Sequence, residues 1–492
     1  MSPRARLPAW PLTWATLWLV ASSLYLAVRY EPFSPDSYVY VAAAQQALET
    51  GSFSLPFAPT TAMSVPVPLS AWPPGYPALV ALATKAGLDP WVAATCVSAI
   101  SMVLLFVAAA VWLARRPGGW AGLGLAGACS MTAVVSVTAW SEGPFVLALA
   151  GAIASLAWLC EPDHRLSWPA ALFFCGALAT ALLIRHACWF VLPAFAWHIQ
   201  RRRSTTRPLA AGSIALACVP AAAWLWRHSP MGLDAMAALE PWRMIRSSGQ
   251  TAAALGKLVM APWLGPEPWL AFPGVLVICG LGVLQWRTRE TQSSFSRLLW
   301  LSGWSLLAGT WIVGLANPAS FFATDRLLWP GWVFLALAVG TSLRPGHAHG
   351  YRVALVFLLL SHSAGVIRLP LLEPRPPLPK QDFHATRQLL SDQLVVSNEA
   401  WRAWHLWGVS GYYLPRAHQG GRVLSPDTLA RWAALRNVNF LLWFEDGLTQ
   451  AESVLRYGPV AEAGHGVAPD VLELVAEDSI CHTYRIRSAG AP

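Results

Sequence analysis

The chain has 492 residues, of which 55% are hydrophobic and 12% are charged, and it contains 28 Trp. Soluble proteins carry about 25% charged residues, so this composition excludes an ordinary soluble enzyme, a disordered chain and a single-pass receptor. The formal net charge of +9 does not indicate nucleic-acid binding, because Lys and Arg occur as small clusters between apolar runs and form no single basic patch.

The apolar runs predict an α-helical polytopic membrane protein with about 11 transmembrane helices. These runs are 7–28, 91–114, 120–138, 144–159, 167–184, 187–199, 209–226, 270–286, 298–315, 327–343 and 353–371. Arg4 and Arg6 precede the first run, and the loops that then lie inside carry more Lys and Arg than the outer ones. The positive-inside rule therefore predicts a cytoplasmic N-terminus and an extracytoplasmic C-terminus.

A long first outer loop, residues 29–90, carries the first candidate site residue. Apolar positions from Tyr38 to Leu48 recur at helical spacing, so we expect a helix lying along the membrane interface and ending at Gly51. Asp36 is predicted at the N-cap of this helix. It is either a plain cap or a carboxylate available for general base chemistry.

Two further outer segments contain candidate residues. The stiff sequence from Trp72 to Pro77 contains Tyr76, which we keep as a possible substrate contact. Glu142, in Ser141-Glu142-Gly143-Pro144, is expected on the same membrane face as Asp36. Glu142 either complements the following helix dipole or forms, with Asp36, a pair of carboxylates at one water-accessible site.

Basic residues at membrane level are candidates for phosphate binding. Arg185 and His186 separate two apolar runs that are short for membrane spans, and such a break is tolerated where the backbone lines a cavity or the protein interior. Asp325 and Arg326 open a later span on the outer face. Guanidinium groups bind phosphate with paired N–H donors, although Asp325 and Arg326 could instead neutralise each other or anchor to lipid headgroups.

The last part of the chain predicts a soluble domain. We expect a transmembrane domain over 1–372, a Pro-rich linker over 373–383 and a small extracytoplasmic α/β domain over 384–492. Strands are predicted at 394–396, 439–443, 471–475 and 482–486. Ser425-Pro426-Asp427 predicts the start of a helix that reaches about Arg436.

The order of these motifs resembles the GT-C superfamily of polytopic glycosyltransferases, in particular bacterial relatives of protein O-mannosyltransferases and of the lipid A aminoarabinose transferase. The similar segments are Pro35-Asp36-Ser37, Trp72-Pro73-Pro74-Gly75-Tyr76-Pro77, the segment around Glu142, the run ending at Arg185, and Phe322 to Pro330. The resemblance extends loosely over the whole chain.

The resemblance implies an inverting transfer of a sugar from a polyprenyl-phosphate donor, on the outer face of a bacterial inner membrane. Asp36 would match the general base, and Glu142 the second acidic residue that helps to orient a substrate. Arg185, with His186, and Arg326 would lie near the donor phosphate, and Tyr76 and Asp325 would contact substrate.

Where the aminoarabinose transferase has a Glu-Lys pair linked to a metal, this chain has Ser70-Ala71-Trp72. The usual ligand position of a divalent metal is therefore not matched, and we predict no metal-binding residue, but whether the reaction depends on a divalent metal stays open.

Two other functions stay open on the sequence. If the protein were a transporter or flippase of lipid-linked sugars, we would expect polar residues in the middle of its spans and repeat symmetry between its two halves. A non-catalytic envelope assembly protein would act through its outer domain alone. Neither the sugar nor the acceptor, whether glycan, lipid or protein, follows from these motifs.

Overall fold

The structure is a computed structural model. The structure describes residues 10–29, 34–60, 62–69, 72–113, 119–161, 168–201, 206–228, 241–259, 268–290, 292–316, 325–342, 348–372, 389–390, 393–414, 424–444, 457, 460–461, 471–478 and 481–487. The predicted linker 373–383 lies outside these residues, as do Arg4 and Arg6.

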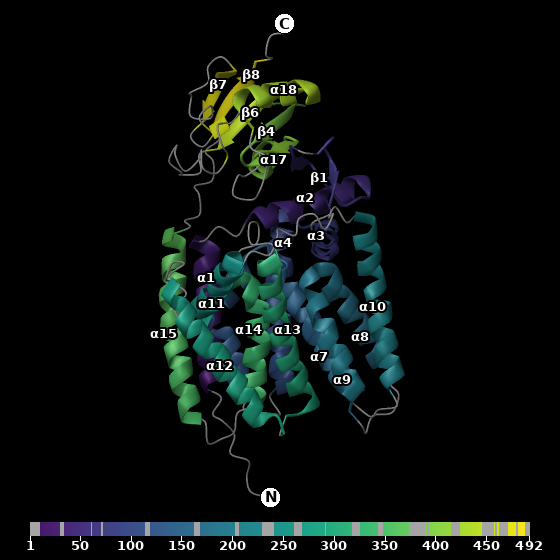
Figure 1. Ribbon diagram of the computed structural model, residues 1–492, viewed down its shortest axis with the longest axis vertical. Coiled ribbons are helices and arrows are strands. Elements are labelled where there is room, and N and C mark those ends of the chain that lie inside the picture. Colours follow the sequence, from purple (N-terminus) through teal and green to yellow (C-terminus); the bar gives the residue numbers. More distant parts are fainter. Residues whose placement is uncertain are drawn as a thin grey trace, which may run out of the picture. The chain divides into compact units, whose positions relative to one another are not determined.

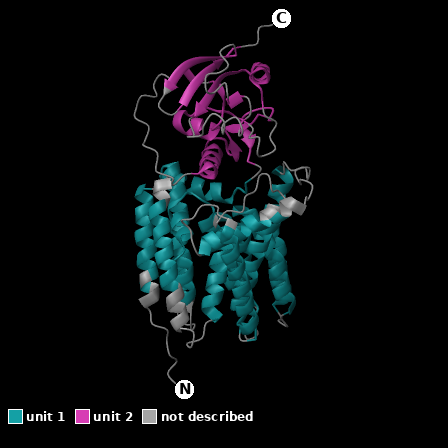
Figure 2. Ribbon diagram, turned by 60° about the vertical axis from the view of Figure 1, so that its left-hand side comes forward, with its two compact units in different colours: residues 1–33, 70–375 teal, residues 34–69, 376–492 magenta. Residues whose placement is uncertain are grey.

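The chain divides into two compact units (Figure 2), of which unit 1 comprises residues 1–33 and 70–375 and unit 2 comprises 34–69 and 376–492. The sequence alone assigned the first outer loop to the transmembrane domain. In the structure, residues 34–69 of that loop belong to the same unit as the C-terminal region.

Unit 1 is a bundle of helices (Figure 1). Its helices are α1 (Trp10–Arg29), α3 (Gly75–Lys85), α4 (Pro90–Leu113), α5 (Gly119–Gly127), α6 (Ser130–Val137), α7 (Glu142–Leu159), α8 (Trp168–Ile184), the 3₁₀ helix η1 (His186–Val191), α9 (Leu192–Arg201), α10 (Arg207–His228), α11 (Pro241–Val259), the 3₁₀ helix η3 (Pro268–Leu270), α12 (Ala271–Thr288), α13 (Ser294–Ala316), α14 (Asp325–Ser342) and α15 (Ala348–Leu372).

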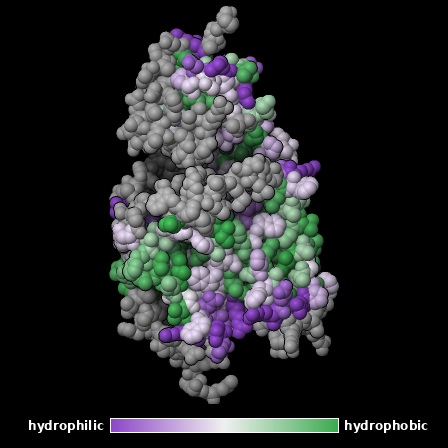
Figure 3. All heavy atoms as spheres, in the orientation of Figure 1, coloured by the Kyte–Doolittle hydropathy of each residue, from purple (hydrophilic) through white to green (hydrophobic). Residues whose placement is uncertain are grey.

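Every predicted apolar run is helical over its described residues except 120–138, which is divided between two helices. Four of the described helices, α4, α7, α10 and α12, are long and apolar enough to cross a membrane. Large apolar side chains are exposed on the bundle and form green areas on the face in Figure 3, as expected where lipid replaces water. The protein is a multi-pass membrane protein, and the number of eleven spans stays a prediction.

The predicted span 120–138 is interrupted, which the hydropathy pattern did not indicate. Helix α5 ends at Gly127 and α6 begins at Ser130. The buried His362 of α15 accepts a hydrogen bond from the Ser130 backbone N–H at Nδ1 (3.0 Å), and Thr132 Oγ1 donates to the Ala126 carbonyl (2.6 Å). These bonds satisfy backbone groups that the break leaves without helical partners.

Helix α11 was not predicted, because its two arginines and one lysine lower the hydropathy of the segment. It packs against α12 at a close approach of two glycines: a Cβ on Gly256 would lie 2.1 Å from the Leu270 carbonyl oxygen.

Unit 2 is built on a mixed sheet of six described strands. Its elements are α2 (Pro35–Thr50), β1 (Ser54–Leu55), β2 (Phe57–Pro59), β3 (Val67–Pro68), β4 (Leu394–Ser397), α17 (Ala400–Trp407), β5 (Gly411–Tyr413), α18 (Pro426–Arg436), β6 (Val438–Phe444), β7 (Leu472–Asp478) and β8 (Cys481–Ile486). The sheet order is β2-β5-β4-β6-β8-β7, and β1 pairs separately with β3. Strands β2, β5, β4 and β6 are parallel, whereas β8 is antiparallel to β6 and β7.

The two faces of this sheet are covered by different helices, as the alternation of side chains along a strand requires. Val396 and Leu441 pack with Leu429 of α18 on one face. Val395 and Leu442 pack with Trp407 of α17 on the other. The predicted strands and the predicted helix from Ser425 to Arg436 are confirmed, and Ser425 caps that helix by accepting from Thr428 N–H.

Candidate functional site

A buried carboxylate at the start of α7 organises the candidate site in unit 1. Glu142 is the first residue of α7, and its side chain is 0% exposed. Gly143 allows this helix start to approach α4, because a Cβ there would lie 3.1 Å from the Ser98 carbonyl oxygen. Ser98 Oγ in turn donates to the Trp140 carbonyl (2.7 Å). The close helix packing therefore fixes the backbone on both sides of Glu142.

Two arginines from distant parts of the chain bind this carboxylate. Arg326, in the first turn of α14, donates from Nε to Glu142 Oε1 (2.5 Å) and from Nη2 to Oε2 (3.3 Å). Arg185 forms an ion pair with Glu142 Oε1 through Nη1, and the same nitrogen donates to Ser141 Oγ (3.3 Å). The sequence analysis placed Glu142, Arg185 and Arg326 among the candidate site residues, and in the structure these three side chains meet.

The positions of both arginines follow from local helix geometry. Helix α8 ends at Ile184, and Arg185 is extended (φ −147°, ψ 132°) before η1 begins. The end of α8 lies close to the start of α3, since a Cβ on Gly75 would be 2.7 Å from the Leu183 carbonyl carbon and oxygen. The guanidinium of Arg326 stacks over the Trp140 ring at 4.1 Å, a contact that restrains its plane.

The charge balance of this trio favours an anion. It contains one carboxylate and two guanidiniums, so the three side chains together carry one net positive charge. Glu142 is fully buried, whereas the side chains of Arg185 and Arg326 are 17% and 16% exposed. Glu142 is therefore a group that positions the arginines, and the arginines are the groups that can reach a ligand. Planar guanidiniums suit the oxygens of a phosphate.

The other predicted site residues of unit 1 are placed differently. Tyr76 is fully buried, and its hydroxyl donates to the Ala94 carbonyl (2.8 Å) and contacts Ser98 Oγ (3.0 Å). Tyr76 therefore connects α3 to the same serine that supports the segment before Glu142. His186 follows Arg185 directly, and its Nδ1 is buried without a hydrogen-bond partner among the described residues. Asp325 is the first residue of α14, but its side chain lies outside what the structure describes.

Asp36 belongs to unit 2, where it lies in the first turn of α2. The predicted N-cap was wrong by two positions, because Ser34 is the N-cap and Pro35 is the first helical residue. The Ser34 backbone N–H donates to Ser37 Oγ (3.0 Å), which explains the shift, since the Ser34–Ser37 pair supplies the cap. Helix α2 ends at Gly51, as predicted, with φ +76°.

Trp140, Ser141 and Ser98 were not singled out as site residues from the sequence. Trp140 and Ser141 adjoin Glu142, so their proximity could have indicated them. Ser98 lies within an apolar run and carries no such signal. Among the described residues, no three His, Cys, Asp or Glu side chains gather as a metal site would require.

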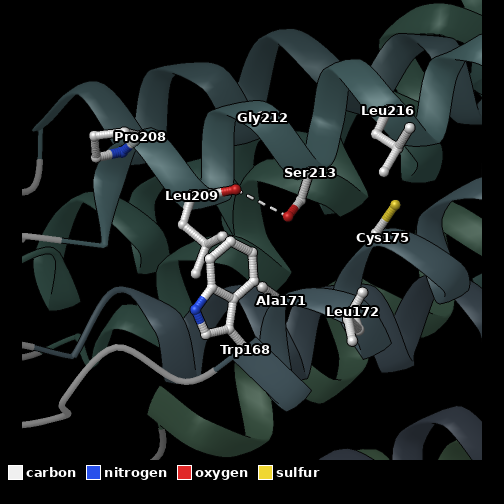
Figure 4. A pocket seen from close by; sticks show the side chains of 9 residues that line it. All are labelled: Trp168, Ala171, Leu172, Cys175, Pro208, Leu209, Gly212, Ser213 and Leu216. Carbon is white, nitrogen blue, oxygen red and sulfur yellow. Dashed lines mark hydrogen bonds between the residues drawn. The ribbon is translucent and has the colours of Figure 1, made fainter.

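An apolar hollow of about 470 Å³ lies elsewhere in unit 1, between α8 and α10 (Figure 4). It is lined by residues such as Trp168, Leu172 and Leu216, and the hydroxyl of Ser213 in its wall donates to the Leu209 carbonyl (2.9 Å). The hollow lies toward the Trp168 end of α8, whereas Arg185 follows the other end, so it is separate from the arginine trio.

The fold of this chain is similar to that of two solved membrane proteins. Solved structures similar to this chain include ArnT from Cupriavidus metallidurans in the apo state, with a TM-score of 0.55, 13% identity and coverage of 98% of this chain and 99% of ArnT. The same protein bound to undecaprenyl phosphate has a TM-score of 0.57 at 12% identity, with the same coverage. The oligosaccharyltransferase AglB from Archaeoglobus fulgidus, in complex with an inhibitory peptide and a dolichol-phosphate, has a TM-score of 0.54 at 12% identity and covers 92% of this chain and 72% of AglB.

ArnT and AglB are both GT-C proteins, so the resemblance read from the motifs is confirmed at the level of the fold. No protein-family model matches the sequence, and no curated protein matches it.

Proposed function

We propose that the protein is an inverting glycosyltransferase that moves a sugar from a polyprenyl-phosphate donor to an acceptor. The observation that carries the proposal is the buried Glu142, which holds Arg185 and Arg326 together in a chain with the GT-C fold. The likeness to ArnT bound to undecaprenyl phosphate and to AglB with a dolichol-phosphate supports a lipid-phosphate donor.

In this proposal the arginines stabilise the leaving group. The bond between the anomeric carbon and the phosphate oxygen breaks, and the electron pair goes to the phosphate of the polyprenyl carrier. Arg185 and Arg326 stabilise the negative charge that develops on this phosphate in the transition state more than they stabilise the ground state. They therefore lower the activation barrier of the transfer. Glu142 keeps both guanidiniums in place, His186 lies at the edge of this phosphate site, and Asp325 contacts substrate.

Asp36 is the proposed general base. Its carboxylate takes the proton from the acceptor hydroxyl or amine as that group bonds to the anomeric carbon from the face opposite the leaving phosphate. The inversion of the anomeric centre follows from this single displacement. The reaction belongs on the outer side of a bacterial inner membrane, with the N-terminus inside.

The test is the variant Asp36→Asn in the purified full-length protein, with transfer from a polyprenyl-phosphate sugar as the readout. Loss of a general base lowers the rate by about 10²–10⁴-fold. Binding of undecaprenyl phosphate should stay unchanged, because the arginines are intact.

The matched control is Glu49→Gln, an exposed acidic residue at the other end of α2. Full activity of Asp36→Asn would remove Asp36 from its role. Movement of the lipid-linked sugar across vesicles without bond cleavage would replace the transferase with a flippase.

A further inference from the structure

Helix α17 connects four separate elements of unit 2 through aromatic side chains. The ring pairs are Trp401 with Tyr413 of β5 (6.5 Å between centroids), Trp404 with Phe57 of β2 (6.3 Å), His405 with Tyr38 of α2 (5.3 Å), and Trp407 with Phe444 of β6 (5.5 Å). Two of these partners, Phe57 and Tyr38, come from the first outer loop, more than 300 positions earlier in the chain.

The first outer loop is built into the C-terminal sheet. Strand β2 is an edge strand parallel to β5, with Phe57 opposite Gly411, and the Gly411 N–H donates to the Pro56 carbonyl (3.0 Å). From α18, Trp432 Nε1 donates to the Thr60 carbonyl (2.9 Å), and Arg436 donates to the Ala62 carbonyl (3.2 Å). The C-terminal region thus binds the main chain of the loop at several points.

Helix α2 depends on these contacts for its position. Most of the stability of a helix in a protein comes from the packing of one face, so α2, with 16 residues, needs a partner for its buried face. Residues Ser37 to Ala44 are buried, and Tyr38 is 8% exposed. Tyr38 lies two positions after Asp36, in the same first turn, so the element that contacts Tyr38 also sets the position of the Asp36 main chain.

We propose that α17 is a positioning element for the reaction, in which Trp404 and His405 hold β2 and the first turn of α2 so that Asp36 keeps its place. This inference rests on the proposed function. It makes the C-terminal region part of the catalytic apparatus, although neither Trp404 nor His405 touches substrate. It also implies that the sheet of the C-terminal region is complete only with the edge strand from residues 57–59.

The experiment compares Trp404→Ala and His405→Ala with Trp401→Ala in the full-length protein. Trp401 lies on the same helix, but its ring pairs with Tyr413 of β5, which makes it a matched control for the contact with α2. Misplacement by about 1 Å can cost about 100-fold in rate, so we expect the first two variants to lower kcat by about 10–100-fold. Their affinity for undecaprenyl phosphate should stay unchanged, and Trp404→Phe and His405→Phe, which keep a ring, should restore most of the rate.

Two further readouts separate positioning from a general structural loss. Amide hydrogen exchange in residues 36–44 and 57–60 should become faster in Trp404→Ala and His405→Ala. In Trp401→Ala, exchange in residues 36–44 should stay unchanged. In an Asp36→Asn background, the alanine variants should add no further loss of rate, because they act through Asp36.

The outcomes that overturn the inference are distinct from failure of the proposed function. Unchanged exchange in residues 36–44 and 57–60 refutes the coupling whatever the activity, and a full additional loss in the Asp36→Asn background refutes action through Asp36. Faster exchange combined with a fully active Asp36→Asn variant would keep the coupling and instead remove Asp36 as the base.

Discussion

The substitution Glu142→Gln tests whether the buried carboxylate holds the two arginines together. Gln keeps the shape of the side chain and removes its charge, and the side chain itself is shielded from water because Glu142 is 0% exposed. At an effective dielectric constant of about 20, unit charges about 4 Å apart attract by about 4 kcal/mol, so two guanidiniums offset the cost of burying one carboxylate. Removing one partner of a buried pair costs about 3–5 kcal/mol, since the other charges stay partly buried.

The assay is unfolding of the purified protein in detergent, followed by titration with undecaprenyl phosphate. We expect Glu142→Gln to lower the free energy of unfolding by about 3–5 kcal/mol and to weaken binding of the lipid, because Arg185 and Arg326 lose their common anchor. Glu290→Gln is the control, as Glu290 is exposed after the end of α12 and such changes stay within about 0.5 kcal/mol. Equal stability of the Glu142→Gln variant and the parent protein would show that the carboxylate does not hold the arginines.

Two further substitutions probe how the site is built. Gly75→Ala should destabilise the protein by about 1–3 kcal/mol in the same unfolding assay, because the added Cβ meets the main chain at the end of α8. Its control is Gly176→Ala, where the added Cβ meets nothing within 4 Å, and this variant should be as stable as the parent protein or more stable. A Gly176→Ala variant less stable than Gly75→Ala would contradict this packing. Arg326→Lys should weaken binding of undecaprenyl phosphate about tenfold or more, because Lys loses the planar fork and the stacking on Trp140. The exposed Arg207→Lys is its control, and an equal effect in both variants would argue against a specific role for Arg326.

Local sequence patterns predicted those helix ends that depend only on neighbouring residues. The helix from Ser425 to Arg436 follows from a cap and a proline at its start, and the end of α2 follows from Gly51. The same reasoning failed at the α5–α6 break, because the groups that stabilise it come from α15. It also missed α11, whose charged residues hide a helix that packs closely on α12.

The predictions for the candidate site also divide into those that local sequence supports and those that depend on tertiary contacts. Arg185 and Arg326 were predicted because a basic residue at membrane level needs a reason, and that argument requires only the sequence. Tyr76 was predicted as a substrate contact because it lies in the stiff sequence from Trp72 to Pro77. In the structure its hydroxyl donates to the main chain of α4. Which polar groups a tyrosine meets depends on the neighbouring helix, which no local pattern specifies.

The amino-acid sequence by itself determined that this chain is a multi-pass membrane protein, where its helices run and which polar residues stand out at their ends, because hydropathy and helix caps are properties of neighbouring residues. Only the tertiary structure decided that Arg326 meets Glu142, 184 positions away, and that residues 57–59 complete the C-terminal sheet. Both contacts arise from the packing of elements far apart in the chain, since a buried carboxylate needs countercharges and a strand edge needs hydrogen-bond partners wherever the fold supplies them.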